Sequence, residues 1–426
     1  RKLQGALRPR SSFSMAAQPE FVAFALDGSH FIRGVETTIH MHVPNYYTVE
    51  KALGAGATGV VASATDLRSN KAVALKKITE PFDHPGEAKR TLRELKYQTP
   101  LQHENIVGIH DVFWGPDNAL YLAQDLMGTD LHWVIRSSQP LARRAVLHLT
   151  YQILLALKYL HKAGLVHRDL KPGNCVVNAR CELKLCDFGM CRVGSSEGMD
   201  HDEKFTEYVT TRWYRSPEVI LEAPYSSKVD VWAAGCIFGE LMARKALFKG
   251  KESRDQLEKI IAVVGGPTEE FIDSTTRVAG ARNFLLKRRH IPTVPWRDAL
   301  VPDVVFGPLD AHCIQALEAM LDFDGRSRQT VSNVMKLPLF DSNRKFQKDQ
   351  ATPAFDDSWE AELDFKDRKA LHAEVLKTAR AYNRQRGLRL DVGAQKRRDS
   401  AESNQTPETV CRTVSSEDME RALADS

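Results

Sequence analysis

The 426-residue sequence has few cysteines and no long apolar run. Its seven cysteines include no Cys-X-X-Cys pair and their number is odd, so neither a zinc site nor a disulfide framework is expected. No segment reaches the roughly 18 consecutive apolar residues that a transmembrane helix needs. The formal net charge of +4 is too small to indicate a nucleic-acid or membrane-surface protein. We therefore expect an intracellular protein with reduced thiols and with neither a nucleic-acid nor a membrane partner.

The rest of the composition is that of a folded protein, with 42% hydrophobic and 27% charged residues. Residues 1–45 show weak periodicity and are expected to form a partly disordered N-terminal extension. Residues 46–124 alternate between short β-branched runs and turns, whereas residues 128–340 are mostly helical in pattern. Residues 341–392 are expected to pack back on this body, and residues 393–426, rich in Ser, Glu, Lys and Arg, to form a disordered tail.

These patterns predict an α+β fold with a small β-rich unit and a larger helical unit. The five predicted strands surround a helix at Gly86–Gln98; they are Tyr46–Leu53, Val60–Asp66, Ala72–Ile78, Ile106–Trp114 and Leu120–Gln124. The later helices are predicted at Ala142–Ala163, Val229–Met242, Ala311–Leu321 and Asp367–Ala381.

A glycine-rich run joins the first two predicted strands and fits the pattern G-x-G-x-x-G-x-V. Such a run lets backbone N–H groups approach phosphate oxygens, although a tight turn gives the same pattern for structural reasons alone. A dinucleotide-binding fold would place a helix after the glycines, and here a strand follows. The run consists of Leu53, Gly54, Ala55, Gly56, Ala57, Thr58, Gly59 and Val60.

Lys76 stands at the end of the apolar run Val73–Lys76, where a buried ammonium group needs an anionic partner. Glu94, on the predicted helix Gly86–Gln98, is a candidate for that partner. Taken alone, the two residues are more often solvated surface charges.

Two polar motifs in apolar surroundings favour a functional role for Lys76 and Glu94 over two solvated surface charges. Val166–Asn174 reads VHRDLKPGN, and Asp187-Phe188-Gly189 begins thirteen residues after Asn174. With the glycine run and Lys76, these motifs resemble the signature of protein kinases, in order and in spacing. The resemblance implies a bilobal fold with a β-rich N-lobe (residues 46–124) and a helical C-lobe (residues 128–340).

The resemblance also implies phosphoryl transfer from ATP, which requires charge neutralisation, Mg²⁺ and an aligned hydroxyl group. Lys76, held by Glu94, would grip the α- and β-phosphates, and Lys171 would lie near the γ-phosphate. Asp169 would orient the substrate hydroxyl group. Thr211 completes the expected catalytic set, and the expected metal ligands are Asn174 and Asp187.

The segment after the Asp-Phe-Gly motif is similar to that of one kinase group. TEYVTTRWYRSPE, from Thr206 to Glu218, resembles the activation segment of ERK-like mitogen-activated protein (MAP) kinases. RTLRELK, HENIVGI and QDLMGTDLH match the same group. VIRSSQPL, KPGN and CELKLCDFG look closest to the fungal cell-wall-integrity MAP kinases.

This likeness implies further roles. Gln124 would be the gatekeeper, and Asp125, Leu126 and Met127 the hinge that holds adenine. Asp130 would reach the ribose; the adenine slot would be lined by Val61, Ala74 and Val176. An upstream dual-specificity kinase would phosphorylate Thr206 and Tyr208, and the candidate counter-cations are Arg90, Arg93, Arg168, Arg212 and Arg215. The implied partners are Ser/Thr-Pro substrates, that kinase and phosphatases, in the cytoplasm and the nucleus.

The sequence also departs from the family. Thr58 replaces the usual aromatic residue of the glycine loop, and Ser216 replaces the usual Ala before Pro217. The stretch 341–350, where MAP kinases carry acidic docking residues, is basic here, and Asp356 and Asp357 are candidate substitutes.

Two alternatives remain open. One is a scaffold that keeps the kinase fold without turnover, against which Lys76, Asp169 and Asp187 all argue. The other is a cyclin-dependent-type kinase, which the Thr-Glu-Tyr motif and the lack of an obvious cyclin-binding helix disfavour.

Overall fold

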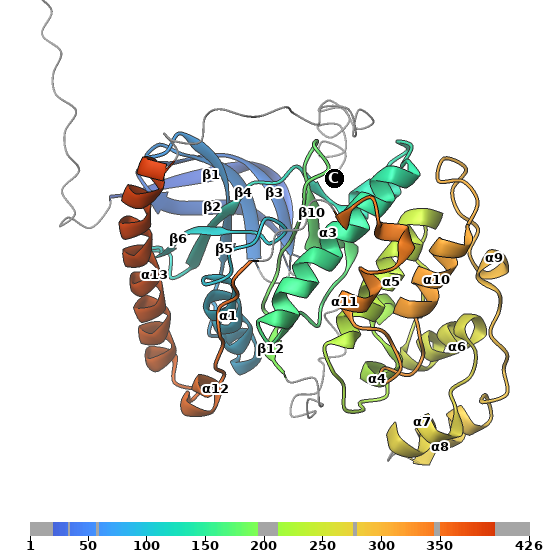
Figure 1. Ribbon diagram of the computed structural model, residues 1–426. Helices are drawn as coiled ribbons and strands as arrows, with labels where there is room; N and C mark the ends of the chain where they lie inside the picture. Colours follow the sequence, from blue (N-terminus) through green and yellow to red (C-terminus); the bar gives the residue numbers. More distant parts are fainter. Residues whose placement is uncertain are drawn as a thin grey trace, which may run out of the picture.

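A β-rich lobe and a helical lobe lie side by side in the computed structural model (Figure 1). The structure describes residues 20–32, 35–56, 59–194, 212–275, 279–344 and 350–396. The expected α+β architecture, with a β-rich lobe and a helical lobe, is confirmed.

The N-lobe is built on a five-stranded antiparallel sheet in the order β3-β4-β5-β7-β6. All five strands were predicted within a few residues; they are β3 (Tyr47–Gly56), β4 (Gly59–Asp66), β5 (Lys71–Ile78), β6 (Ile109–Trp114) and β7 (Leu120–Asp125). Along β4, Val60, Ala62 and Ala64 are buried in one cluster on one face, because alternate residues of a strand point to opposite faces.

An N-terminal hairpin, β1 (Phe21–Ile32) and β2 (Val35–Pro44), covers that face. Ile39, Met41 and Val43 are buried against the sheet and alternate with histidines. The extension was predicted to be partly disordered, and the hairpin was missed although this alternation is a strand signal. Residues 1–19 lie outside the described part of the chain.

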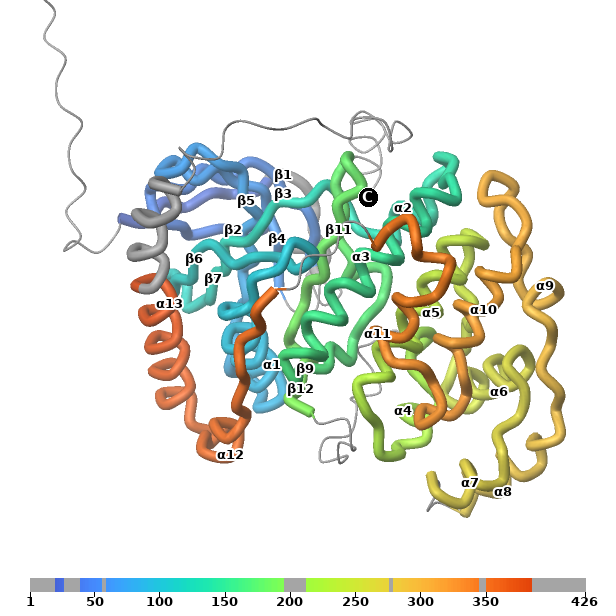
Figure 2. The backbone as a smooth tube through the Cα atoms, viewed as in Figure 1, coloured from blue at the N-terminus to red at the C-terminus, as the bar shows by residue number. Residues whose placement is uncertain are grey.

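Helix α1 (Pro85–Gln98) packs between the N-lobe sheet and the C-terminal extension (Figures 1 and 2). The extension contains α12 (Trp359–Glu362) and α13 (Arg368–Lys396). Leu92 and Leu95 of α1 share one hydrophobic cluster with Leu371 and Val375 of α13. Helix α13 continues past residue 393, where the tail was predicted to begin, and residues 397–426 are outside the description.

The C-lobe is built around α3 (Arg143–Lys162) and α5 (Lys228–Ala243). Helix α5 is apolar on nearly all sides and is almost completely buried, as expected for a central helix. The other C-lobe helices are α2 (Leu131–Arg136), α4 (Pro217–Ile220), α6 (Ser253–Val264), α7 (Glu269–Thr275), α8 (Ala279–Leu286), α9 (Trp296–Ala299), α10 (Ala311–Met320) and α11 (Val331–Val334).

Short elements near the lobe boundary carry the polar motifs. The strands are β8 (Thr129–Asp130), β9 (Leu165–Val166), β10 (Cys175–Val177), β11 (Leu183–Leu185) and β12 (Arg192–Val193). The 3₁₀ turns are η1 (Pro172–Asn174), η2 (Arg212–Tyr214) and η3 (Pro338–Phe340).

The described cysteines agree with the expectation of reduced thiols, with one exception. The free thiols are Cys175, Cys186, Cys191, Cys236 and Cys313. Cys181 is instead disulfide-bonded. Among the helices that the structure describes, none has the length and apolar character needed to cross a membrane.

Candidate active site

The glycine run forms a tight hairpin between β3 and β4, with Gly56 opposite Gly59. Gly59 has a φ of +136°, and a Cβ atom there would lie 2.0 Å from the carbonyl oxygen of Lys77. Only glycine fits this position. Gly54 and Ala55 are exposed, so their backbone is accessible to a ligand. Ala57 and Thr58 lie outside the described residues.

One residue of the predicted nucleotide site belongs to the opposite face of the sheet. Val60 packs into the cluster under the N-terminal hairpin, so its side chain does not face the predicted nucleotide side, and a nucleotide contact through its backbone stays a prediction. Val61 and Ala74 occupy the other face, because Val61 pairs with Lys76 and Ala74 with Gln124 in the sheet register.

Lys76 and Glu94 form the predicted ion pair. The Lys76 Nζ donates to Glu94 Oε1 at 2.5 Å, and both residues are buried. Burial alone would lower the pKa of Lys76, but the carboxylates of Glu94 and Asp187 outweigh it and raise that pKa above its usual value. Burial and the charge of Asp187 keep the pKa of Glu94 above its usual value despite Lys76. One lysine is thus shared between two carboxylates.

Asp187 lies next to this pair with its backbone in the left-handed region, at a φ of 63°. Burial favours its neutral form, but the positive charges of Lys76 and Lys171 hold its pKa below the usual value. The next residue, Phe188, is fully buried, and its ring lies 5.3 Å from that of His167. Asp187 is therefore an ionised carboxylate at a rigid position.

A buried carboxylate from α5 fixes the loop that carries the VHRD motif. The carboxylate of Asp230 accepts the backbone N–H groups of His167 and Arg168, each at 2.9 Å, and contacts His161 Nε2 at 2.8 Å. These contacts stabilise a loop in which Arg168 has a φ of 68°. Asp230 was not among the predicted site residues, although a buried carboxylate in a largely apolar helix is a signal of such a role.

Asp169, Lys171 and Asn174 meet within this loop. Lys171 Nζ donates to Asp169 Oδ2 at 2.7 Å, and Asn174 Nδ2 donates to the same oxygen at 3.1 Å. Because Asn174 donates through its nitrogen, its amide oxygen is left as a hard ligand. Together with the carboxylate of Asp187, this oxygen suits Mg²⁺, which takes few protein ligands and keeps several waters.

The predicted hinge is fixed by the side chain of Asp125. Its carboxylate accepts the N–H of Gly108 at 2.9 Å and contacts His110 at 2.6 Å and Lys184 at 3.0 Å. Despite burial, the hydrogen bonds from His110 and Gly108 lower the pKa of Asp125. Asp130 is the N-cap of α2, accepting the N–H of Trp133 at 3.0 Å. Its predicted contact with a ribose stays a prediction.

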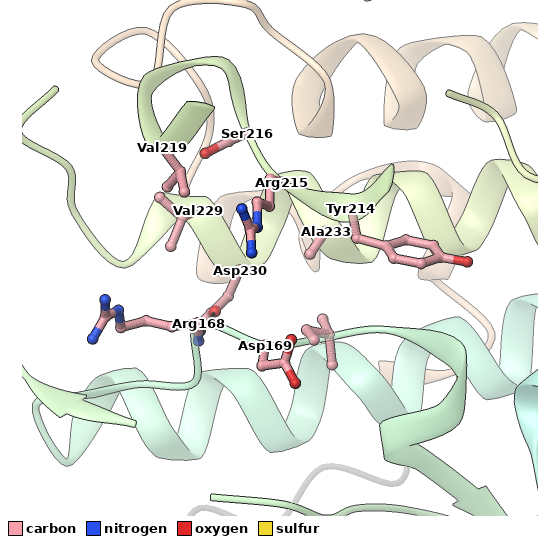
Figure 3. A pocket seen from close by; sticks show the side chains of 10 residues that line it. Arg168, Asp169, Tyr214, Arg215, Ser216, Val219, Val229, Asp230 and Ala233 are labelled. Carbon is pink, nitrogen blue, oxygen red and sulfur yellow. Dashed lines mark hydrogen bonds between the residues drawn. The ribbon is translucent and has the colours of Figure 1, made fainter. Parts of the chain in front are cut away.

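A small pocket lies beside Asp169 (Figure 3). Arg168 and Asp169 line one side of it, and the segment with Tyr214, Arg215 and Ser216 lines the other. The pocket therefore joins the catalytic loop to the C-terminal end of the predicted activation segment. The predicted catalytic residue Thr211 and the phosphorylation sites Thr206 and Tyr208 lie in residues 195–211, outside the described part.

The candidate counter-cations are not all in one place. Arg93 forms an ion pair with Glu360 of the C-terminal extension, with an Nη2–Oε2 distance of 2.6 Å. Arg212 donates to the carbonyl oxygen of Lys251 at 2.6 Å. Arg215 lines the small pocket instead.

Comparison with known proteins gives a consistent result. A family model described as "Protein kinase domain" matches residues 47–340. "Mitogen-activated protein kinase 4" of Oryza sativa subsp. japonica is 39% identical over 319 residues, covering 73% of this chain and 82% of the relative. "Mitogen-activated protein kinase 6" of Arabidopsis thaliana is 42% identical over 295 residues, covering 68% of this chain and 71% of the relative.

A fungal relative is similar to the same degree. "Mitogen-activated protein kinase HOG1A" of Wallemia ichthyophaga is 41% identical over 297 residues, covering 70% of this chain and 77% of the relative. The chain therefore belongs to the protein kinase family, as a serine/threonine kinase of the mitogen-activated protein kinase type.

Proposed function

We propose that this kinase transfers the γ-phosphate of Mg·ATP to Ser or Thr residues followed by Pro, after dual phosphorylation of Thr206 and Tyr208. The main support is the joined set of ionic interactions among Lys76, Glu94, Asp169, Lys171 and Asp187. Lys76 pairs with Glu94 at 2.5 Å, Lys171 binds Asp169 at 2.7 Å, and both lysines act on Asp187. A scaffold without turnover would not need this set.

Each residue of the set has a separate task. Lys76 is a fixed cation for phosphate oxygens, and Glu94 prevents it from turning away. Asp169 accepts the proton of the substrate hydroxyl group and orients its oxygen, while Lys171 places a positive charge beside that carboxylate. When bound, Mg²⁺ neutralises phosphate charge, and Asn174 and Asp187 would hold it.

Regulation and cellular role follow from the resemblance of the motifs. Each phosphate on Thr206 or Tyr208 adds about −1.5 to −2 charge, enough to order a segment against arginine side chains. The proposed partners are Ser/Thr-Pro substrates, an upstream dual-specificity kinase and phosphatases. The proposed setting is a cell-wall-integrity or stress cascade acting in the cytoplasm and nucleus, supported by the resemblance of VIRSSQPL and KPGN to that fungal group.

A phosphate-transfer assay with two matched peptides, Ser-Pro and Ser-Ala, tests this function. The enzyme is assayed with Mg·ATP before and after dual phosphorylation, with Asp169→Asn as the blank. We expect transfer selective for Ser-Pro that phosphorylation raises strongly, and only a low basal rate in the Thr206→Ala, Tyr208→Phe variant, which phosphorylation cannot activate.

Two results would contradict the proposal. Equal transfer to both peptides would remove the proline specificity. No transfer above the blank, despite confirmed phosphorylation of both residues, would favour the scaffold.

A further inference from the structure

A carboxylate from the C-terminal extension lies among the arginines of the active centre. Glu360, in α12, receives two hydrogen bonds from Arg93, at 2.8 Å from Nε and 2.6 Å from Nη2. Arg192 Nη1 donates to Glu360 Oε2 at 2.6 Å. Tyr97 contributes its hydroxyl group to Glu360 Oε1 at 3.2 Å. Such charge-assisted, bidentate geometry is among the strongest that a carboxylate forms.

The two arginines belong to different parts of the catalytic machinery. Arg93 precedes Glu94 on α1, and Arg192 lies three residues after Gly189, at the start of the activation segment. Arg192 pairs with Val166 in the register of β12 with β9, two residues before Arg168 of the catalytic loop. Burial, and then the charges of Arg192 and Arg93 against that of Tyr225, lower the pKa of Arg168. Glu360 therefore sits where α1, the catalytic loop and the activation segment meet.

The surrounding extension holds Glu360 in place. Trp359 packs against the ring of Tyr97 at 6.1 Å, and Lys96 pairs with Glu374 of α13 at 2.6 Å. Further along α13, Tyr382 donates its hydroxyl group to the carbonyl oxygen of Ile109 at 2.5 Å. The side chain of Glu360 is 12% exposed and that of Arg93 only 3%. Burial favours neutral Glu360, but Arg93 and Arg192 hold its pKa below the usual value.

The contact coexists with an assembled active site. Lys76 and Glu94 remain paired, and Phe188 remains packed on His167, while Glu360 binds Arg93 and Arg192. Because Arg93 and Glu94 are adjacent on one helix, a movement of α1 that separates Arg93 from Glu360 also strains the pair of Glu94 with Lys76. Glu360 thus supports the assembled arrangement rather than opposing it.

We propose that Glu360 is a positioning residue that takes the place of the activation phosphate: it ties α1 to the activation segment before Thr206 is phosphorylated. This inference rests on the proposed function and takes Arg93 and Arg168, two of the five candidate counter-cations, as those that bind phosphorylated Thr206. A phosphate carries more negative charge than a carboxylate, and once it is present it links α1 to the activation segment in place of Glu360.

The test is Glu360→Gln, which keeps the size of the side chain and removes its charge. In the Thr206→Ala, Tyr208→Phe background, we expect about tenfold lower kcat/KM for a Ser-Pro peptide, within the usual range of coupling between two sites. In dually phosphorylated protein, we expect the same substitution to change kcat/KM by less than about twofold. Glu362→Gln, an exposed carboxylate two residues further on, is the matched control and should have no effect in either background.

Each other outcome overturns the inference. An unchanged or higher activity of Glu360→Gln without phosphorylation would make Glu360 neutral or inhibitory. An equal loss in both backgrounds would show a role in stability only. Where turnover of the unphosphorylated protein is too slow to measure, the rate of amide hydrogen exchange in α1 is measured instead. We expect Glu360→Gln to accelerate that exchange, and an unchanged exchange rate contradicts the proposal. If phosphorylated wild-type protein transfers no phosphate to the Ser-Pro peptide, the proposed function is refuted instead. The hydrogen-exchange experiment would still test the role of Glu360.

Discussion

Two adjacent residues of α1 form buried ion pairs on different sides of the helix. Glu94 pairs with Lys76 of β5 at 2.5 Å, and Arg93 pairs with Glu360 of the C-terminal extension at 2.6 Å. The carboxylates are similarly buried, with exposed fractions of 5% for Glu94 and 12% for Glu360. Their electrostatic situations are opposite. The pKa of Glu94 is raised, by burial first, whereas arginine contacts lower that of Glu360.

The two pairs differ in the charges that surround each carboxylate. In the inner pair, Lys76 interacts with Glu94 and also with the charge of Asp187, and burial keeps the pKa of Glu94 raised in spite of Lys76. In the outer pair, two arginines serve one carboxylate, which is therefore well compensated. A compact ammonium group suits the inner side, where we propose that it also binds phosphate, and the planar guanidinium group suits a fixed structural contact. The inner pair is arranged for chemistry and the outer pair for position.

The largest expected effect is on the inner side, where Asp187→Asn removes a carboxylate without changing side-chain size. We expect loss of phosphate transfer by about three orders of magnitude or more, comparable with removing a principal electrostatic group of an active site. The fold should survive, since the hydrophobic cluster around Phe188 is unchanged. Transfer to the Ser-Pro peptide and thermal unfolding measure the two quantities. Asp298→Asn, on the exposed surface of α9, is the control, and full activity of Asp187→Asn would refute the metal assignment.

The next effect distinguishes charge from packing in the inner pair. Lys76→Met leaves Glu94 buried beside Asp187, and we expect the free energy of unfolding to fall by about 3–5 kcal/mol. The double variant Lys76→Met, Glu94→Gln removes both charges and should regain part of that stability while staying inactive. Urea unfolding together with the transfer assay checks this. A double variant less stable than Lys76→Met would mean that Glu94 does not depend on Lys76.

We expect Arg93 and Glu360 of the outer pair to be coupled in the free energy of unfolding. Their substitution should affect phosphate transfer less than substitutions in the inner pair. Arg93→Met and Glu360→Gln, made singly and together, form a double-mutant cycle. We expect a coupling energy of about 1–3 kcal/mol in unfolding, as for contacting charged residues. The exposed pair Arg180–Glu182 is the control, with an expected coupling of about 0–1 kcal/mol. Equal coupling energies for Arg93–Glu360 and Arg180–Glu182 would contradict the expectation that the buried pair is more strongly coupled than the exposed pair.

The smallest effect concerns His103, a half-buried base outside both pairs. Burial, and then the charge of Lys184, lowers the pKa of His103 to about 4, and its Nδ1 accepts the N–H of Asn105 at 3.0 Å. Between about pH 6.5 and pH 4 the unfolded chain binds this proton more readily, so the free energy of unfolding falls as the pH is lowered.

We expect His103 to contribute roughly 1 kcal/mol to this fall by pH 5, after allowance for its partial exposure. Urea unfolding of wild type and His103→Gln at pH 7.5 and pH 5 measures it. The exposed His312→Gln is the control, and identical pH dependence of wild type and His103→Gln would contradict the assignment.

Local pattern predicted much of the molecule. The five strands of the N-lobe sheet and helices α1, α3, α5 and α10 were found from periodicity, because each buries one face or all faces in a regular way. The contact between Lys76 and Glu94 was predicted from two motifs only 18 residues apart. The hairpin at residues 21–44 was missed because its short alternation is interrupted by polar residues.

Other parts could not be predicted from local pattern. Asp230 acts on a loop 62 and 63 residues earlier in the chain, and its role depends on how α5 packs beneath that loop. The face occupied by Val60 followed from the hairpin that covers it, which the motif does not encode. The predicted helix at Asp367–Ala381 was found, but it extends to Lys396, where few apolar residues mark its end.

The sequence by itself determined which carboxylates, amide and lysines we propose to meet a phosphate, because each lies in an ordered motif within a short segment of characteristic local geometry. Tertiary structure alone decided what supports that chemistry. Arg93 and Glu360 are 267 residues apart, and no local pattern in either segment predicts their contact. They meet because α13 shares the hydrophobic cluster of α1, and that packing carries α12 and its carboxylate to the arginines.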